Sequence, residues 1–134
     1  MQTVNLFIAG DHCPATSGKR FERSNPITGD VATSAAAATV EDATRAADAA
    51  AAAFPVWSAT PPGERRRLLL AAAQALLAAG PDITQAMKEE IGATDAWAGF
   101  NVKLASDMLV EAASLTTQIK GEIIPSNRPG TMAM

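Results

Sequence analysis

The pattern of apolar and polar positions begins with short runs bounded by turn residues. Val4–Ala9 is an apolar, β-prone run that ends at Gly10-Asp11, which predicts a strand and a tight turn. Arg20–Ser24 and Asp30–Ser34 flank an Asn-Pro-Ile-Thr-Gly segment, in which proline presets φ and glycine permits left-handed geometry. We therefore expect the chain to begin with short strands joined by tight turns.

From Thr39 onward the spacing of apolar residues becomes helical, and cap signals divide the helices. Thr39 and Asp42 fit a capping box at the first helix, while Thr60 is expected to cap the second. Pro55 should kink or end the first helix, because proline lacks a backbone N–H. A shorter helix over about Pro81–Ile91 should stop at Gly92. The longest helix then follows and should end at Gly121.

Apolar stripes on three of these helices predict the packing. Each stripe indicates that the helix has one apolar face. We expect the apolar face of the second helix to be buried. The stripe residues are Ala43, Ala46, Ala47, Ala50, Phe54 and Trp57, then Leu68, Leu69, Ala72, Leu76 and Leu77, and in the last helix Leu104, Met108, Ala112, Leu115 and Ile119. Beyond the last helix, Glu122–Pro125 and Thr131–Met134 are expected to be extended.

Composition changes this picture in two respects. The 134 residues are 48% hydrophobic and 19% charged, which is typical of a folded globular chain. Long alanine runs favour helix, yet alanine supplies little apolar area for a core.

The net charge of −3 argues against nucleic-acid or anionic-membrane partners. A single cysteine, no signal peptide and no membrane-length apolar stretch make a cytoplasmic protein the default expectation.

Residue types that could perform chemistry are sparse. His12 and Cys13 are neighbours on a predicted strand, so their side chains point to opposite faces and cannot easily act together. They also cannot assemble a zinc site alone. The Glu64–Arg67 run fans around a helix and indicates a solvated helix start, and the pair Asp107 and Glu111 is typical of a surface. No glycine-rich phosphate loop occurs in the sequence.

Trp97 and Phe100 are the most interesting pair. They lie three residues apart at the start of the last helix, with Gly99 and Asn101 beside them. An aromatic pair with a small neighbour could line a flat pocket for an aromatic ligand. Ordinary core anchoring in an alanine-rich protein is the alternative that the pattern alone favours.

Several segments in fixed order carry a family resemblance. NLFIAG, FERSNPITGDV and AFPVWSATPPGERRRLLLAAAQALL resemble the amino-terminal region of the NAD(P)-dependent aldehyde dehydrogenase superfamily. GATDAWAGFNV and EAASLTTQIKGEIIPS look more narrowly like the salicylaldehyde dehydrogenase branch, which acts on aromatic aldehydes. The resemblance covers essentially all of this chain, but about the first quarter of a family enzyme.

The resemblance implies an α/β, aldehyde dehydrogenase-like fold for the complete enzyme. Residues 1–38 would be its short strands and turns, residues 39–120 about four helices, and residues 121–134 the start of an oligomerisation extension. In the family, a cysteine thiolate attacks the aldehyde, hydride passes to NAD, and the product is the carboxylic acid. These catalytic and cofactor-binding residues would lie beyond this chain, so we carry over none of them.

The resemblance also implies partners. A small aromatic aldehyde such as salicylaldehyde would be the substrate of the complete enzyme, and the enzyme would be a homo-oligomer, either dimer or tetramer. Trp97 and Phe100 would then be substrate-shaping residues beside the substrate tunnel. We expect the chain alone to be inactive and to bind NAD no better than background. The choice between NAD and NADP stays open.

Two other classes of function remain open at this level. A free-standing helical module could bind a partner through its leucine and methionine stripes. A nucleic-acid binder built on Arg65–Arg67 is disfavoured by the acidic balance.

Overall fold

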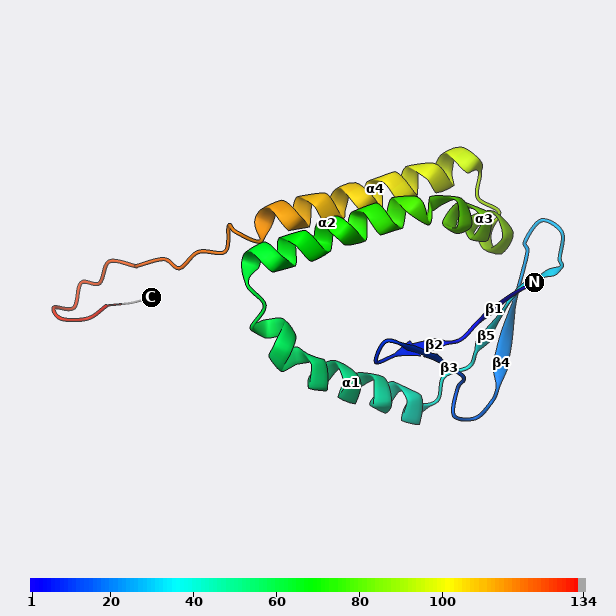
Figure 1. The fold of residues 1–134 in the computed structure, drawn as a ribbon, viewed down its shortest axis with the longest axis horizontal. Helices are drawn as coiled ribbons and strands as arrows, with labels where there is room; N and C mark the ends of the chain where they lie inside the picture. The colour runs from blue at the N-terminus through cyan, green and yellow to red at the C-terminus, as the bar shows by residue number, and fades with distance from the viewer. Residues whose placement is uncertain (133–134) are drawn as a thin grey trace.

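Strands lie at the start of the fold and helices follow them (Figure 1). The computed structural model describes residues 1–132. The elements are β1 (Gln2–Val4), β2 (Leu6–Ile8), β3 (Asp11–Cys13), β4 (Arg20–Ser24), β5 (Val31–Ala36), α1 (Val40–Ser58), α2 (Pro62–Ala78), α3 (Gly80–Ile91) and α4 (Asp95–Leu115). This is the expected order of short strands and four helices, and the last helix is the longest, as predicted.

The five strands form two small sheets. β2 and β3 make an antiparallel hairpin whose turn residues Ala9 and Gly10 have φ of 57° and 91°, the left-handed geometry that tight two-residue hairpins need. In the other sheet β5 is central, parallel to β1 and antiparallel to β4. Both turns therefore lie near where they were predicted, but the first is formed by Ala9 and Gly10 instead of Gly10 and Asp11. The single strand predicted over Val4–Ala9 is wrong, because β1 ends at Val4 and β2 belongs to the other sheet.

Arg20 holds the three-stranded sheet together from its outer strand. Its guanidinium donates to Val4 O at 2.8 Å, to Asn5 Oδ1 at 3.1 Å and to the Oγ and carbonyl oxygen of Ser34 at 2.9 and 2.6 Å. One side chain thus bonds the strand at each edge to the central strand.

Helix α3 docks this sheet onto the helices. Thr33 Oγ1 donates to Glu90 Oε1 at 2.6 Å, and Arg23 Nε lies 3.3 Å from Glu90 Oε2. The α3 helix stops at Gly92, as predicted, and this glycine, with a φ of 68°, forms a left-handed C-cap. A Cβ at Gly92 would lie 3.3 Å from Pro26 Cγ, so the β4–β5 turn also needs a glycine there.

The helices pack through their smallest side chains. α2 and α4 lie side by side, and α3 contacts α4 as well as β4 and β5 (Figure 1). The buried hydrophobic residues of the described chain are Ala15, Ala32, Ala36, Ala73, Ala98, Val102 and Ala113. Ser106, also buried, donates through Oγ to Ala73 O at 3.2 Å between α2 and α4. Close approach of the helix backbones, rather than large side chains, makes this interface.

The expectation that the apolar stripe of α2 is buried is wrong, since only Leu69 and Leu76 of that stripe are even half-buried. On α2 the buried residue is Ala73, whereas Leu68, Ala72 and Leu77 are exposed. The α4 stripe is exposed too, and that helix buries its small-residue face instead, with Ala98, Val102, Ser106 and Ala113. Periodicity located apolar faces correctly, but the faces that pack are those whose residues are small enough for close approach.

Two expected helix boundaries are also wrong. Thr60 does not cap α2, because its hydroxyl donates to Val56 O and the N-cap is Pro61 without a side-chain bond. Pro55, which was expected to kink or end α1, does not end it, because the helix continues to Ser58. α4 ends at Leu115, so Gly121 is not its C-cap. The following residues run out from the helices (Figure 1), and Ala133 and Met134 of the segment expected to be extended lie outside the described residues.

Candidate functional site

Trp97 and Phe100 form a stacked pair on the first turns of α4. Their ring centroids lie 5.6 Å apart with an interplanar angle of 25°. The two residues are 55% and 54% exposed, respectively, so the pair is not the core anchor that pattern alone favoured. A flat apolar surface of this kind is suited to a planar ring, because offset stacking is the geometry that aromatic pairs prefer.

The start of α4 is fixed by local hydrogen bonds. Thr94 Oγ1 accepts the backbone N–H of Trp97 at 3.2 Å and caps the helix. Lys88 Nζ, in the last turn of α3, lies 2.8 Å from Oδ1 of Asp95. Asn101 Nδ2 donates to Trp97 O at 2.8 Å. These contacts set the backbone from which the indole projects.

An apolar stripe, defined as Trp97, Leu104, Met108 and Leu115, continues along the exposed side of α4. Intervals of seven, four and seven residues place these four side chains on one helix face. All four are exposed. The aromatic pair is therefore the amino-terminal end of a longer apolar surface. This stripe contains no nucleophile or titratable group.

The structure keeps His12 and Cys13 apart, as the strand geometry predicted. The His12 ring lies against Phe7, with centroids 5.1 Å apart. Cys13 Sγ accepts from Arg45 Nη2 at 3.4 Å. No hydrogen bond within residues 1–132 joins the two side chains, and nothing orients His12 as a base for the thiol.

The arginine run on α2 has structural partners. Arg65 donates to Trp57 O, Ser58 O and Thr60 O, and its guanidinium lies 5.5 Å from the centre of the Trp57 ring. Arg67 pairs with Glu64, which lowers the pKa of the Glu64 carboxyl through this hydrogen bond. These contacts fit the predicted solvated helix start. Similarly, Asp107 pairs with Lys103 on the surface of α4.

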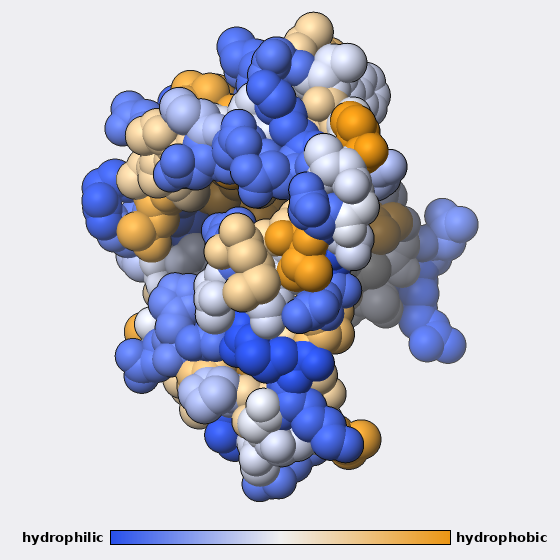
Figure 2. Space-filling view, turned by 90° about the vertical axis from the view of Figure 1, so that its right-hand side faces the viewer, coloured by the Kyte–Doolittle hydropathy of each residue, from blue (hydrophilic) through white to orange (hydrophobic). Residues whose placement is uncertain are grey.

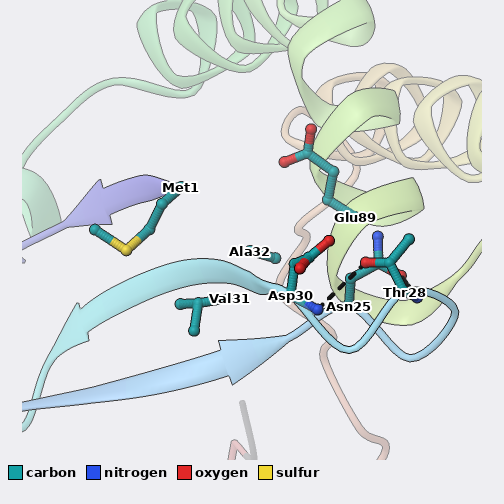
Figure 3. A pocket seen from close by; sticks show the side chains of 7 residues that line it. All are labelled: Met1, Asn25, Thr28, Asp30, Val31, Ala32 and Glu89. Atoms are coloured by element: carbon teal, nitrogen blue, oxygen red, sulfur yellow. Dashed lines mark hydrogen bonds between the residues drawn. The ribbon is translucent and has the colours of Figure 1, made fainter.

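A second surface feature lies between the β4–β5 turn and α3 (Figure 3). It is a hollow of about 280 Å³. Its lining comprises Met1, Asn25, Thr28, Asp30, Val31, Ala32 and Glu89. Figure 3 shows Asp30 on the turn and Glu89 on α3 as its charged side chains, both carboxylates. Its lining contains no aromatic side chain, so it offers an aromatic ligand no ring to stack on.

Sequence reasoning missed the central role of Asp42. This residue was expected as a helix cap, yet its buried carboxylate also accepts from Thr16 N–H at 3.1 Å and from Thr16 Oγ1 at 2.6 Å. The Thr16 bonds, together with those from Thr39, hold the pKa of Asp42 far below its ordinary value. A sequence offers no signal for a contact between residues 26 positions apart.

The chain is similar to known proteins along its whole length. The family model described as the aldehyde dehydrogenase family matches residues 12–134. A vanillin dehydrogenase from Pseudomonas fluorescens is 52% identical over all 134 residues of this chain. The chain spans 28% of that relative's length.

Solved structures give the same result. A salicylaldehyde dehydrogenase from Pseudomonas putida G7, complexed with salicylaldehyde, superimposes with a TM-score of 0.93 at 42% identity, over 98% of this chain and 27% of its own. An NAD-dependent benzaldehyde dehydrogenase from Corynebacterium glutamicum superimposes with a TM-score of 0.85 at 31% identity, over 92% of this chain and 27% of its own.

Proposed function

The chain belongs to the aldehyde dehydrogenase family, and from that premise we propose that it forms the amino-terminal quarter of an enzyme that oxidises an aromatic aldehyde to its carboxylic acid. The observation that supports this best is the identity of 52% with a vanillin dehydrogenase along the whole chain. The salicylaldehyde and benzaldehyde dehydrogenases among the similar structures are also named for aldehydes on a benzene ring. An exposed, stacked aromatic pair suits the same class of substrate.

We assign the NAD of this enzyme to residues outside the chain, because the described residues do not fit a dinucleotide. A pyrophosphate favours a helix N-terminus with free N–H groups and no nearby negative charge. Each of the four helices has an acidic residue in its first turn, namely Glu41 and Asp42, Glu64, Asp82, and Asp95. Family membership and the NAD-dependent relative support NAD in general.

Trp97 and Phe100 are proposed to shape the substrate site. The stacked rings would cover one face of the aldehyde's ring, while the reacting carbonyl would extend toward catalytic groups beyond this chain. A substrate without an aromatic ring would gain less binding free energy from the same surface, because stacking adds to the energy of ordinary apolar burial. The free-standing helical module has no support among the relatives.

The first test is to read the coding DNA on from Met134 and to assay the complete gene product with salicylaldehyde, vanillin and NAD. We expect NADH to form. If neither aldehyde is oxidised, the proposal is wrong. The 134-residue chain alone is expected to form none, and NADH production by it would show that the catalytic groups lie within these residues.

The second test is Trp97→Ala in the complete product. We expect kcat/KM to fall about tenfold more for benzaldehyde than for a small aliphatic aldehyde, since the stacking surface is lost. Phe54→Ala, which removes an exposed ring from α1, is the matched control and should leave the ratio unchanged. An equal loss for both aldehydes would return Trp97 to a purely structural role.

A further inference from the structure

Asn101 lies one helical turn beyond Trp97 on the same side of α4. Its position four residues on from Trp97, and one from Phe100, places its amide beside the aromatic pair. The residue is half-buried. Trp97, Phe100 and Leu104 around it are apolar, so Asn101 is the polar group of this part of the face.

A hydrogen bond fixes which end of the amide points away from the helix. Asn101 Nδ2 donates to the backbone carbonyl oxygen of Trp97 at 2.8 Å. The reverse orientation would bring the amide oxygen against that carbonyl oxygen, and two acceptors repel. Oδ1 is therefore the end left over, and within residues 1–132 no donor is bonded to it.

Neighbouring polar groups do not compete for this acceptor. Within residues 1–132 no hydrogen bond joins the Thr94 hydroxyl to Asn101, and the Lys103 ammonium is paired with Asp107. The face thus presents a flat apolar pair with one oriented hydrogen-bond acceptor at its edge. A planar ring that carries a hydrogen-bond donor matches both features.

We propose that Asn101 determines specificity for ring-hydroxylated aromatic aldehydes, with Oδ1 accepting the hydrogen bond of the ring hydroxyl while the ring stacks on Trp97. This inference rests on the proposed function and narrows its substrate class. A ring without the hydroxyl would stack equally well but would leave Oδ1 to water, so discrimination comes from one hydrogen bond.

The experiment compares benzaldehyde with 2-, 3- and 4-hydroxybenzaldehyde in the complete gene product. In Asn101→Leu, we expect the ratio of kcat/KM for the best hydroxybenzaldehyde to that for benzaldehyde to fall about five- to tenfold. Gln74→Leu, which removes an exposed amide from α2, is the matched control and should leave the ratio unchanged.

A second variant separates recognition from a structural role. Asn101→Asp keeps an acceptor oxygen but loses the donor to Trp97 O, so the preference for the hydroxylated ring should persist even where activity falls on all four aldehydes. If both variants lose that preference, or if Asn101→Leu lowers all four rates equally, Asn101 acts only through the Trp97 backbone and the inference fails. An unmodified protein that oxidises none of the four would overturn the proposed function instead.

Discussion

Asp42 joins the strand region to the first helix through a single buried carboxylate. It completes the capping box with Thr39, whose N–H donates to Asp42 Oδ2 at 2.9 Å. The same group receives both the N–H and the hydroxyl of Thr16, from the loop before β4. Arg45 Nη2, one turn further along α1, lies 3.6 Å from Oδ1. All of these partners favour the ionised carboxylate.

The depressed pKa of Asp42 predicts an acid-labile fold. A carboxyl whose folded pKa lies below its unfolded value of 3.8 stabilises the fold above that value and loses the contribution as the pH falls. Thermal unfolding followed by circular dichroism should therefore show Tm falling below about pH 4. Asp42→Asn should lower Tm at pH 7 and flatten this dependence.

The control for that measurement is Asp48→Asn, an exposed carboxylate in the middle of α1. This variant should follow the unmodified protein at every pH. A pH profile that Asp42→Asn leaves as steep as before would mean that other carboxyl groups cause the acid sensitivity.

At the scale of elements, the contact between α2 and α4 depends on small side chains. Ala113 and Ala98 of α4 are fully buried. The contact of α4 with α3 is equally close, because a Cβ at Gly80, the first residue of α3, would lie 3.3 Å from Val102 Cγ1. Interiors of proteins are close-packed, so an added side chain at such a position must displace its neighbours.

Ala113→Leu should therefore destabilise the protein by about 1–3 kcal/mol through overpacking. Ala112→Leu, an exposed neighbour on the same helix, is the control and should change stability by less than about 0.5 kcal/mol. Urea unfolding at equilibrium measures both. Equal stability of the two variants would mean that the helices separate at little cost.

The same interface shows which parts of the fold the sequence could predict. The hairpin turns, the Thr39 capping box and the helix stop at Gly92 follow from local chemistry, and each is found at or near the expected position. The packed face of α4 cannot be predicted from local chemistry. Hydrophobic periodicity favours burial of the larger residues Leu104 and Met108 over burial of Ala98 and Ser106. Size complementarity between two helices, which decides the outcome, is a property of the pair and not of either sequence segment.

The candidate site was predictable to a similar extent. The spacing of Trp97 and Phe100 placed them on adjoining faces, but only the structure shows the rings stacked and exposed. Asn101 was visible beside them, although the direction of its amide depends on the hydrogen bond to Trp97 O. Side-chain orientation of this kind has no signature in a sequence.

For the whole molecule, the distribution of apolar surface is the main consequence. The core is almost entirely alanine, whereas large apolar side chains lie exposed on α1, α2 and α4. The side of the molecule seen in Figure 2 is largely hydrophilic with separate hydrophobic patches. Within the described residues no helix is long and apolar enough to cross a membrane. Exposed apolar patches of this kind are commonly surfaces for association.

The α4 stripe should therefore cause the 134-residue chain to associate. At concentrations of tens of micromolar, sedimentation velocity should give an average mass above the 13.8 kDa of one chain. Met108, which is 64% exposed in the middle of the stripe, is the residue to change. Met108→Lys should move the average mass toward that of a single chain, because a charge in the contact surface must be desolvated on association.

Ser114→Lys adds the same charge to the exposed side of α4 away from the stripe, so it should leave the association unchanged. If the chain sediments as a monomer at every concentration, the exposed stripe does not cause association. If both lysine variants dissociate the assembly equally, net charge rather than the α4 stripe controls association. Loss of association in Met108→Lys alone would identify the stripe as the surface through which the chains associate.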